Sequence, residues 1–408
     1  FIIITLFWIV LSLVGSIPFY LYGMTFIDSF FESMSGITTT GATVISGLDN
    51  MPESVLFYRQ LLQWMGGMGL IVLAIAVMPL LGIGGGQLYK TEIPGALSDQ
   101  KLTPRIKETA QALWLIYLGL TIVCALLYFA FGMTTFDAIS HSLSTVSIGG
   151  FSTHDESIGY FNSISIEIIC MIFMLLSALS YALHYFAVYK KKPLKYFHDS
   201  ELRFFISILS IVIGLSLLLS IIVGYDGHSF REILFQSVSI VTTTGFVSTD
   251  YSSWPTSITF LLLIGAFIGA CSGSVGGGIK SWRVLIMINH AKINIMRLVH
   301  PNAVVSLKIG SKAVDDKVAE SVWGFFSIYV ICFMLLLLSL LATGMDFESS
   351  FSAIGACLNN LGPGLGQVAD TYGPVSSFGK SILALAMILG RLEIFTLLVL
   401  FTTVFWQK

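Results

Sequence analysis

The sequence is poor in charged residues. Only 11% of its 408 residues are Asp, Glu, Lys or Arg, whereas soluble domains carry about 25%. Hydrophobic residues make up 55% of the chain, and its mean hydropathy is +0.86. This composition excludes an ordinary soluble domain and indicates a protein of the lipid bilayer.

The chain also lacks paired cysteines. Its five cysteines stand alone in apolar surroundings, with no Cys-x-x-Cys motif: Cys124, Cys170, Cys271, Cys332 and Cys357. This pattern is typical of buried free thiols and disfavours a disulfide or metal-binding role for the cysteines.

Signals for catalysis and for nucleic-acid binding are missing too. No Gly-x-Ser-x-Gly occurs, and neither His141 nor His184 has a fixed spacing to a serine, so an intramembrane hydrolase is disfavoured. The lysines are spread along membrane-flanking loops. We therefore expect no enzymatic activity, no covalent cofactor and no nucleic-acid partner.

The start of the sequence is unusual. Phe1 opens inside an apolar run, and neither a basic region nor a cleavage site precedes that run. We therefore expect no signal peptide, and we expect native sequence to precede Phe1.

One short sequence motif occurs four times in the chain. A hydroxyl-rich stretch of half-helix length runs into a glycine at residues 33–42 and 237–246, both with Thr-Thr-Thr-Gly, and looser copies occupy 142–151 and 353–363. A single copy is typical of a helix-ending turn. Four copies, each between two long apolar segments, indicate four arcs around one axis.

The lengths of the apolar segments predict the topology. Long segments are able to span a hydrocarbon core of about 30 Å, and they occupy residues 1–22, 55–83, 108–132, 160–189, 202–224, 256–288, 318–344 and 376–406. Shorter apolar segments lie between them, each of about a dozen residues, or roughly 18 Å of helix. One ends at Thr38, and the others cover 135–147, 229–241 and 347–358. They are too short to cross, so we expect re-entrant pore helices followed by irregular backbone shielded from lipid.

These lengths predict an all-α polytopic membrane protein. It consists of four pseudosymmetric helix–pore loop–helix units around one central pore. The predicted units are residues 1–83, 84–189, 190–297, in which the second helix is interrupted, and 298–408.

Basic residues lie mainly where one unit joins the next. Of 21 Lys and Arg residues, 17 lie in the joining segments or at the C-terminus, and only Arg59, Arg231 and Lys380 lie in the loops within units. The positive-inside rule therefore places the joining loops in the cytoplasm and the re-entrant turns outside. Acidic residues gather on the outer side, where they either concentrate cations or are ordinary solvated loop charge.

The repeated motif can supply oxygen ligands to a dehydrated cation. Glycine-bearing strands can aim backbone carbonyls in one direction, as in potassium channel filters, and each half-helix points its negative end inward. The looser copies replace the threonines with other residues, so an even ring must come from main-chain oxygens. The predicted potassium-binding filter residues are Thr39, Thr40, Gly41, Ile148, Gly149, Gly150, Thr243, Thr244, Gly245, Asn360, Leu361 and Gly362.

Four motifs carry a family resemblance: residues 242–246 (Thr-Thr-Thr-Gly-Phe), 276–280 (Gly-Gly-Gly-Ile-Lys), 359–364 (Asn-Asn-Leu-Gly-Pro-Gly) and Gly390-Arg391. Over essentially its whole length the chain resembles the TrkH-type membrane subunits of the Trk/Ktr/HKT superfamily of potassium transporters.

The resemblance implies a fourfold pseudosymmetric pore, a homodimer, a cytosolic nucleotide-binding regulatory ring (TrkA-like) and a place in the bacterial inner membrane. TrkH-type chains usually carry two further N-terminal helices. In plant relatives a serine at the first filter glycine goes with sodium transport, so Gly41 implies potassium selectivity.

Six glycines interrupt the apolar segment at residues 265–281. Each costs a helix about 1 kcal/mol relative to alanine, so we expect a break at mid-membrane depth. A nucleotide-phosphate loop is excluded because Ile279 separates Gly278 from Lys280. Two interpretations stay open: close helix packing, or a flexible gate formed by Gly276, Gly277, Gly278 and Lys280, which the family resemblance favours.

Arg391 is the fifth predicted gate residue and lies in a different segment. It lies midway along 376–406, about 22 Å from the C-terminal end if the helix is continuous, and a charge there is costly. The resemblance implies a positive group below the filter that slows ions. An interhelical salt bridge or hydrogen bonds to loop carbonyls are the alternatives, and Glu393 is too near in sequence to be its partner.

The sequence therefore predicts channel-like potassium uptake across the cytoplasmic membrane. Flux passes a carbonyl-lined filter and a mid-membrane glycine loop controlled by a cytosolic regulatory subunit, for which the basic joining loop 280–317 is a candidate docking site. The alternative is a potassium symporter coupled to protons or sodium. A receptor or structural membrane protein would not need four re-entrant turns.

Overall fold

The structure, a computed structural model, describes residues 2–72, 106–225, 227, 229–301, 305–310, 312–401 and 403–406. The described chain is almost entirely helical, and its two strands form one small hairpin, β1 (Lys308–Ile309) and β2 (Lys312–Ala313). The predicted all-α polytopic fold is confirmed.

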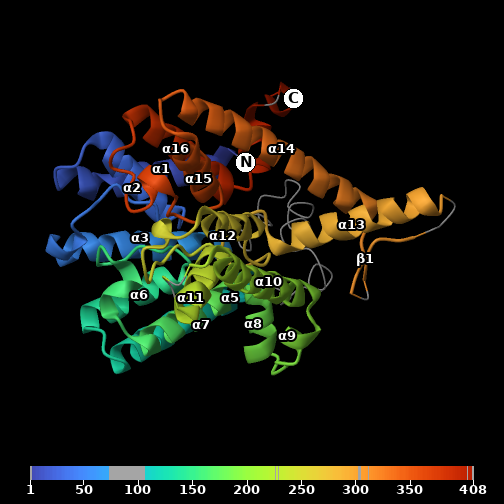
Figure 1. Cartoon of the computed structure of the whole chain (residues 1–408), viewed down its shortest axis with the longest axis horizontal. Coiled ribbons are helices and arrows are strands. Elements are labelled where there is room, and N and C mark those ends of the chain that lie inside the picture. Colours follow the sequence, from blue (N-terminus) through green and yellow to red (C-terminus); the bar gives the residue numbers. More distant parts are fainter. Residues whose placement is uncertain are drawn as a thin grey trace.

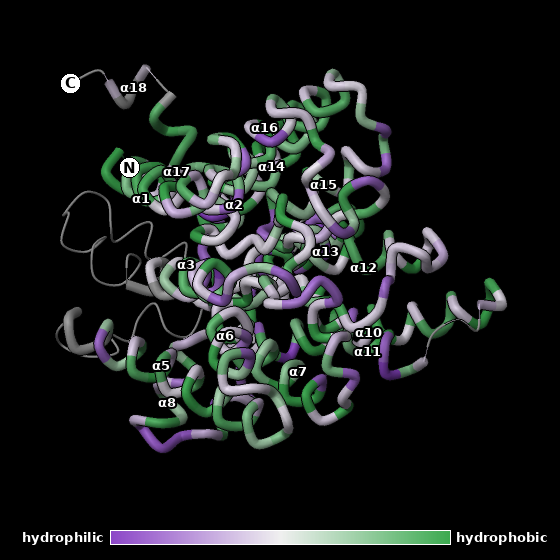
Figure 2. The backbone as a smooth tube through the Cα atoms, turned by 90° about the vertical axis from the view of Figure 1, so that its left-hand side faces the viewer, coloured by the Kyte–Doolittle hydropathy of each residue, from purple (hydrophilic) through white to green (hydrophobic). Residues whose placement is uncertain are grey.

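Four long apolar helices form the scaffold: α1 (Ile2–Leu21), α5 (Ile106–Ala130), α10 (Ser200–Val223) and α14 (Asp316–Leu341). Each is long and apolar enough to cross a membrane. Their exposed side chains are hydrophobic, such as Leu21 and Ile221, whereas many buried residues are serines and threonines. Figure 2 shows hydrophobic stretches along the long helices and hydrophilic stretches in loops. This pattern is that of a protein whose surrounding solvent is lipid.

Four half-helices follow the long helices where the sequence predicts them: α2 (Phe26–Ile37), α6 (Thr135–Val146), α11 (Phe230–Val241) and α15 (Phe347–Leu358). All four have 12 residues. Each begins at a side chain that accepts a hydrogen bond from the third helical N–H, namely Thr25, Thr134, Ser229 and Asp346. Such caps satisfy backbone donors that the first turn leaves free.

The second long segment is one helix in the first unit, as far as the structure describes it, and is broken in the other three. The helices concerned are α3 (Glu53–Val72), α7 (Ile164–Ala178) with α8 (Tyr181–Val188), α12 (Thr256–Ile268) with α13 (Ser281–Val299), and α16 (Ser377–Arg391) with α17 (Phe395–Leu398). The predicted interruption of 256–288 is confirmed. The rest of the predicted segment 55–83 after Val72 lies outside the described residues.

Two expectations of continuous spans are wrong. The predicted span 160–189 bends by 98° between α7 and α8. At that bend the Cys271 N–H donates to the Ala178 carbonyl (3.0 Å), and the Tyr181 N–H donates to the Gly273 carbonyl (3.0 Å). A distant loop thus satisfies the backbone groups that the break exposes. The predicted span 376–406 also breaks, because α16 ends at Arg391 and both Glu393 and Ile394 have positive φ.

Smaller elements lie outside the long helices: η1 (Leu48–Asn50), η3 (Ser157–Phe161), α9 (Lys195–His198), η4 (Tyr251–Ser253), η5 (Gly366–Val368), η6 (Val399–Phe401) and α18 (Thr403–Trp406). Figure 1 shows α13 and β1 projecting away from the helical bundle, with the lower end of α14 beside them.

The packing is cyclic. The second helix of each unit contacts the half-helix of the next, in the pairs α3 with α6, α7 with α11, α12 with α15, and α16 with α2. The two largest of four hydrophobic clusters among the described residues come one mainly from residues 112–275 and the other mainly from the first and last quarters of the chain. Figure 1 shows the same division, with α1 and α2 beside α15 and α16. The boundaries of the four units stay a prediction.

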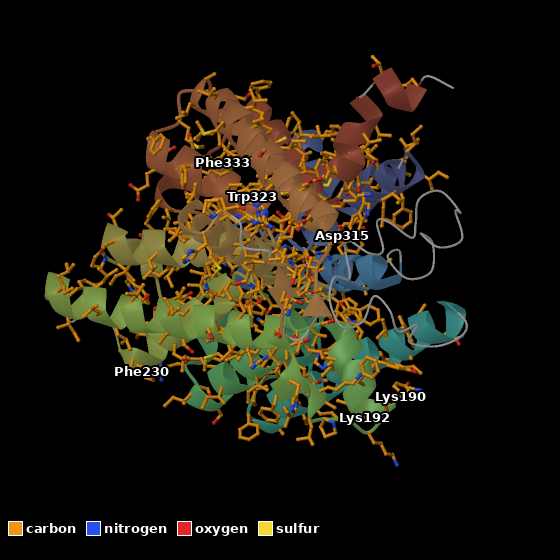
Figure 3. The ribbon with its side chains drawn as sticks, turned by 90° about the vertical axis from the view of Figure 1, so that its right-hand side faces the viewer. Lys190, Lys192, Phe230, Asp315, Trp323 and Phe333 are labelled. Carbon is orange, nitrogen blue, oxygen red and sulfur yellow. The ribbon has the colours of Figure 1, made fainter. Side chains whose placement is uncertain are left out.

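The two ends of the bundle differ. In Figure 3, Phe230 at the start of a half-helix lies at one edge, and Lys190, Lys192 and Asp315 lie toward the opposite edge. The start of α11 and the basic loop after α8 therefore lie at opposite ends of the molecule, which agrees with the sidedness that the charge distribution predicts.

Candidate ion filter

Each half-helix ends in the same turn. We number the four following segments as segment 1 (residues 38–41), segment 2 (147–150), segment 3 (242–245) and segment 4 (359–362). In segment 1 the Thr40 N–H donates to the Ser35 carbonyl (2.8 Å), and the Thr39 N–H donates to the Gly36 carbonyl (3.0 Å). Both bonds recur at the corresponding residues of the other three segments. This pair of bonds is a Schellman motif, which satisfies the last helical carbonyls.

The turn places one side-chain-bearing residue of each segment in the left-handed region. Their φ values lie between 51° and 63°, and the residues are Thr39, Ile148, Thr243 and Asn360. This conformation costs an L-residue about 1–2 kcal/mol, and three of the four are β-branched. Strain of this kind persists only where the surrounding structure over-determines the backbone, so the turn is built into the fold four times.

The four segment-ending glycines close a ring. All have positive φ, from 79° to 99°. A Cβ added to Gly41 would lie 2.2 Å from the Gly149 oxygen, and one added to Gly150 would lie 2.0 Å from the Thr244 oxygen. Gly245 faces the Leu361 oxygen in the same way, and Gly362 faces the Thr40 oxygen, at 2.1 and 2.6 Å. Each glycine therefore abuts a backbone oxygen of the next segment, and the fourth returns to the first.

All twelve predicted filter residues lie in this ring. Seven of the twelve carry side chains, all of them buried, and these side chains make different contacts in the four segments. Thr40 and Thr38 join their hydroxyls (2.7 Å), as do Thr244 and Thr242 (2.7 Å). In segment 4 the Asn360 amide donates to the Thr40 hydroxyl (3.0 Å). Side chains do not repeat around the ring, whereas the backbone does.

A buried ion pair stands directly beside segments 1 and 2. Arg59 of α3 donates to Glu32 of α2 (2.8 Å), to the Thr43 hydroxyl (3.0 Å) and to the Ser152 carbonyl (3.1 Å). Both charged side chains are fully buried. The prediction that Arg59 lies in a loop is wrong, because Arg59 lies within α3, where it ties together the two chain segments that leave the ring.

The other basic residues within units are paired as well. Lys380 of α16 contacts Asp28 of α2 (2.6 Å), and Arg231 of α11 contacts Glu167 of α7 (3.2 Å). Several outer acids therefore have structural partners, so the acidic mouth is smaller than the sequence suggests.

His154 links two outer loops. Its Nδ1 lies 2.5 Å from Asp49, and its Nε2 lies 3.3 Å from Asp137. Burial lowers the pKa of His154, but the two carboxylates outweigh burial and raise that pKa above its usual value. The hydrogen bond with His154 lowers the pKa of Asp49. These shifts favour the charged pair.

The loop between α12 and α13, residues 269–280, contains the predicted gate residues Gly276, Gly277, Gly278 and Lys280 and packs against segments 3 and 4. The Gly277 N–H donates to the Thr243 hydroxyl (2.7 Å), and the Gly278 N–H donates to the Asn359 carbonyl (3.1 Å). A Cβ on Gly277 would lie 1.9 Å from the same Asn359 oxygen, so only glycine permits this approach.

Two cations bond to carbonyls of this loop, Arg391 from α16 and Lys280 from the loop itself. Arg391 at the end of α16 donates to the Val275 carbonyl (2.8 Å) and to the Gly66 carbonyl of α3 (3.3 Å). The Lys280 ammonium donates to the Gly276 carbonyl. Of the alternatives for Arg391, hydrogen bonding to loop carbonyls is what the structure shows, and Glu393 instead pairs with Arg283 of α13.

Sequence reasoning missed the residues that brace the ring from neighbouring helices. Besides Arg59 and Glu32, Gln63 of α3 reaches segment 2 and donates to the Gly149 carbonyl (2.6 Å). Its signal in the sequence is a polar residue inside a long apolar segment, and nothing local names its partner.

A family model described as "TrkH: Cation transport protein" matches residues 1–408. The chain belongs to the TrkH family. It is 53% identical to the Trk system potassium uptake protein TrkH of Halomonas elongata, over 100% of this chain and 86% of that protein. It is 46% identical to the Trk system potassium uptake protein TrkG of Escherichia coli, over 100% of this chain and 85% of that protein.

A TrkH-family fold is also seen by comparison with solved structures. The crystal structure of the potassium transporter TrkH from Vibrio parahaemolyticus matches with a TM-score of 0.89 and 48% identity, covering 100% of this chain and 85% of that one. Together with its apolar helices, membership of the TrkH family makes the chain a multi-pass membrane protein.

Proposed function

We propose that this chain takes up potassium through the ring, in the bacterial inner membrane, by a channel-like path. The observation that carries the proposal is the fourfold repeat of one strained turn, closed by four glycines that each abut a backbone oxygen of the next segment. An even ring of main-chain oxygens can replace the hydration shell of a cation. The names of the potassium uptake relatives agree with this choice of ion.

The electrostatics favour a cation at the ring. Each half-helix runs directly into its segment, so four negative helix ends converge on the same place. Main-chain carbonyls can bind the cation together even though the side chains differ between segments, so Ile148 and Leu361 are compatible with the ring. Among the described residues no cluster of His, Cys, Asp and Glu is arranged to hold a metal ion, and a carbonyl ring needs none.

The gate belongs to the same proposal. The loop 269–280 bonds to segments 3 and 4, Arg391 of α16 bonds to its Val275 carbonyl, and Lys280 within the loop bonds to its Gly276 carbonyl. The loop leads directly into α13, which projects from the bundle, so a cytosolic partner that moves α13 would move the loop. The regulatory nucleotide-binding ring and the homodimer rest on the family resemblance.

Rubidium uptake into liposomes containing the purified protein tests this function. With no proton or sodium gradient imposed, wild-type protein should take up rubidium far faster than sodium. Gly245→Ser should lose this discrimination, because its Cβ meets the Leu361 oxygen. Equal uptake of both ions by the wild type and the variant would contradict the filter assignment, and uptake that needs a counter-gradient would favour the symporter.

A further inference from the structure

Segment 2 departs from the other three at one position. The second-last residue of each segment is Thr40, Gly149, Thr244 or Leu361, so only segment 2 has no side chain there. Gly149 does not have a positive φ. The backbone at this position therefore has no need of glycine, and something else must exclude a side chain.

Gln63 occupies the missing side chain's place. A Cβ built on Gly149 would lie 2.3 Å from both Cδ and Oε1 of Gln63 and 2.8 Å from its Nε2, and these are its three nearest atoms. Gln63 comes from α3 of the preceding unit and is completely buried. Its amide thus stands where segments 1 and 3 carry a threonine.

The Gln63 amide is held on both sides. Its Oε1 accepts from the Ser144 hydroxyl (2.5 Å) and from the Phe151 N–H (3.1 Å), and its Nε2 donates to the Gly149 carbonyl (2.6 Å). Exchanging the amide O and N would set donor against donor at Phe151 and acceptor against acceptor at Gly149. The network therefore fixes which end faces the ring.

The bond does not displace the Gly149 carbonyl from the ring. Its oxygen lies 2.2 Å from the Cβ position of Gly41, and the equivalent separations at the other three junctions are 2.0, 2.1 and 2.6 Å. Without Gln63, a glycine with a free φ and ψ would carry this oxygen beside an empty cavity, and the Phe151 N–H would be buried without a partner.

We propose that Gln63 is a specificity-determining residue of the filter: its side chain replaces the missing threonine of segment 2 and fixes the Gly149 oxygen as one member of the cation-binding ring. This inference rests on the proposed function and adds to it the group that holds the second segment to the size of the ring.

The test measures the ratio of rubidium to sodium uptake in liposomes for wild type, Gln63→Ala and the shape-conserving Gln63→Met. We expect both variants to lower the ratio about tenfold, the effect of losing one buried hydrogen-bond partner. Leu62→Ala is the matched control, since Leu62 is the buried neighbour on the same helix. It should lower thermal stability and leave the ratio unchanged.

A compensating pair sharpens the test. Gly149→Thr alone should lose folding or ion discrimination, because the new Cβ meets Gln63. The double variant Gln63→Ala/Gly149→Thr rebuilds the threonine pattern of segments 1 and 3, so it should restore most of the rubidium-to-sodium uptake ratio. Wild-type discrimination retained by folded Gln63→Ala and Gln63→Met would overturn the inference. If Gln63→Ala and Gln63→Met both misfold, the inference is also overturned when Gln63→Ala/Gly149→Thr restores neither folding nor ion discrimination. A wild type that does not discriminate would instead refute the proposed function.

Discussion

Segments 1 and 3 of the ring carry Thr-Thr-Thr-Gly, whereas segments 2 and 4 carry Ser-Ile-Gly-Gly and Asn-Asn-Leu-Gly. All four nevertheless share the same Schellman bonds, the same left-handed residue and the same glycine contact. The threonine segments brace themselves through paired hydroxyls. Segment 2 uses Gln63, and segment 4 reaches outward through Asn360 to Thr40 and to the Met387 carbonyl. The backbone conformation therefore repeats in all four segments, whereas the side-chain hydrogen bonds that hold it differ from segment to segment.

The largest effect should come from breaking the Arg59–Glu32 ion pair, which lies beside segment 1, a threonine segment, and segment 2, which has no threonine. Arg59→Met leaves the buried Glu32 carboxylate without its partner, and we expect a loss of about 3–5 kcal/mol of stability. Thermal unfolding in detergent measures it. Adding Glu32→Gln should recover part of the loss; if the single and double variants unfold at the wild-type temperature, the pair is no brace.

Alanine at each ring glycine tests whether the two kinds of segment are equivalent. At Gly41, Gly150 and Gly245 the added Cβ would lie within 2.2 Å of a backbone oxygen, so we expect losses of about 2–4 kcal/mol each, together with lost discrimination between rubidium and sodium. Gly362→Ala should be the mildest, because its separation is 2.6 Å. Effects confined to Gly41 and Gly245 would show that only the threonine segments form the site.

Removing a threonine hydroxyl should have a smaller effect. Thr244→Val loses one hydroxyl contact and should cost about 1 kcal/mol, with ion discrimination kept. Thr40→Val should cost more, since Thr40 also accepts from Asn360. Uptake ratios and unfolding temperatures of the two variants distinguish bracing from direct coordination: a collapse of discrimination in both would mean that the hydroxyls themselves bind the ion.

The smallest effect concerns pH at His154, which links an outer loop of the first unit to the second unit through Asp49 and Asp137. Because the pKa of His154 is raised, its contribution to stability is complete below the unfolded value of about 6.5 and is lost as pH rises through the folded value. The lowered pKa of Asp49 acts in the opposite direction, so its contribution is lost only in acid. Unfolding temperatures should fall slightly from pH 6 to pH 9 in wild type and less in His154→Gln. An identical slope in both would contradict this origin.

The sequence predicts local features well and distant partners poorly. Segment length and hydroxyl patterning place the four half-helices and the twelve ring residues, because these signals are local. The bend after Ala178 has no glycine or proline to announce it and depends on bonds to the loop near Gly273. Gln63 and Arg59 find partners 86 and 93 residues away, and no pattern within α3 specifies them. Arg391 at the end of α16 likewise bonds to the carbonyls of Val275 and Gly66, 116 and 325 residues away.

The position of a bound ion tests the central claim most directly. Anomalous scattering from crystals grown with rubidium should show a peak on the ring axis, equally distant from the carbonyl oxygens of Thr40, Gly149, Thr244 and Leu361. A peak held by the threonine hydroxyls of segments 1 and 3 alone, or no peak within the ring, would contradict the account.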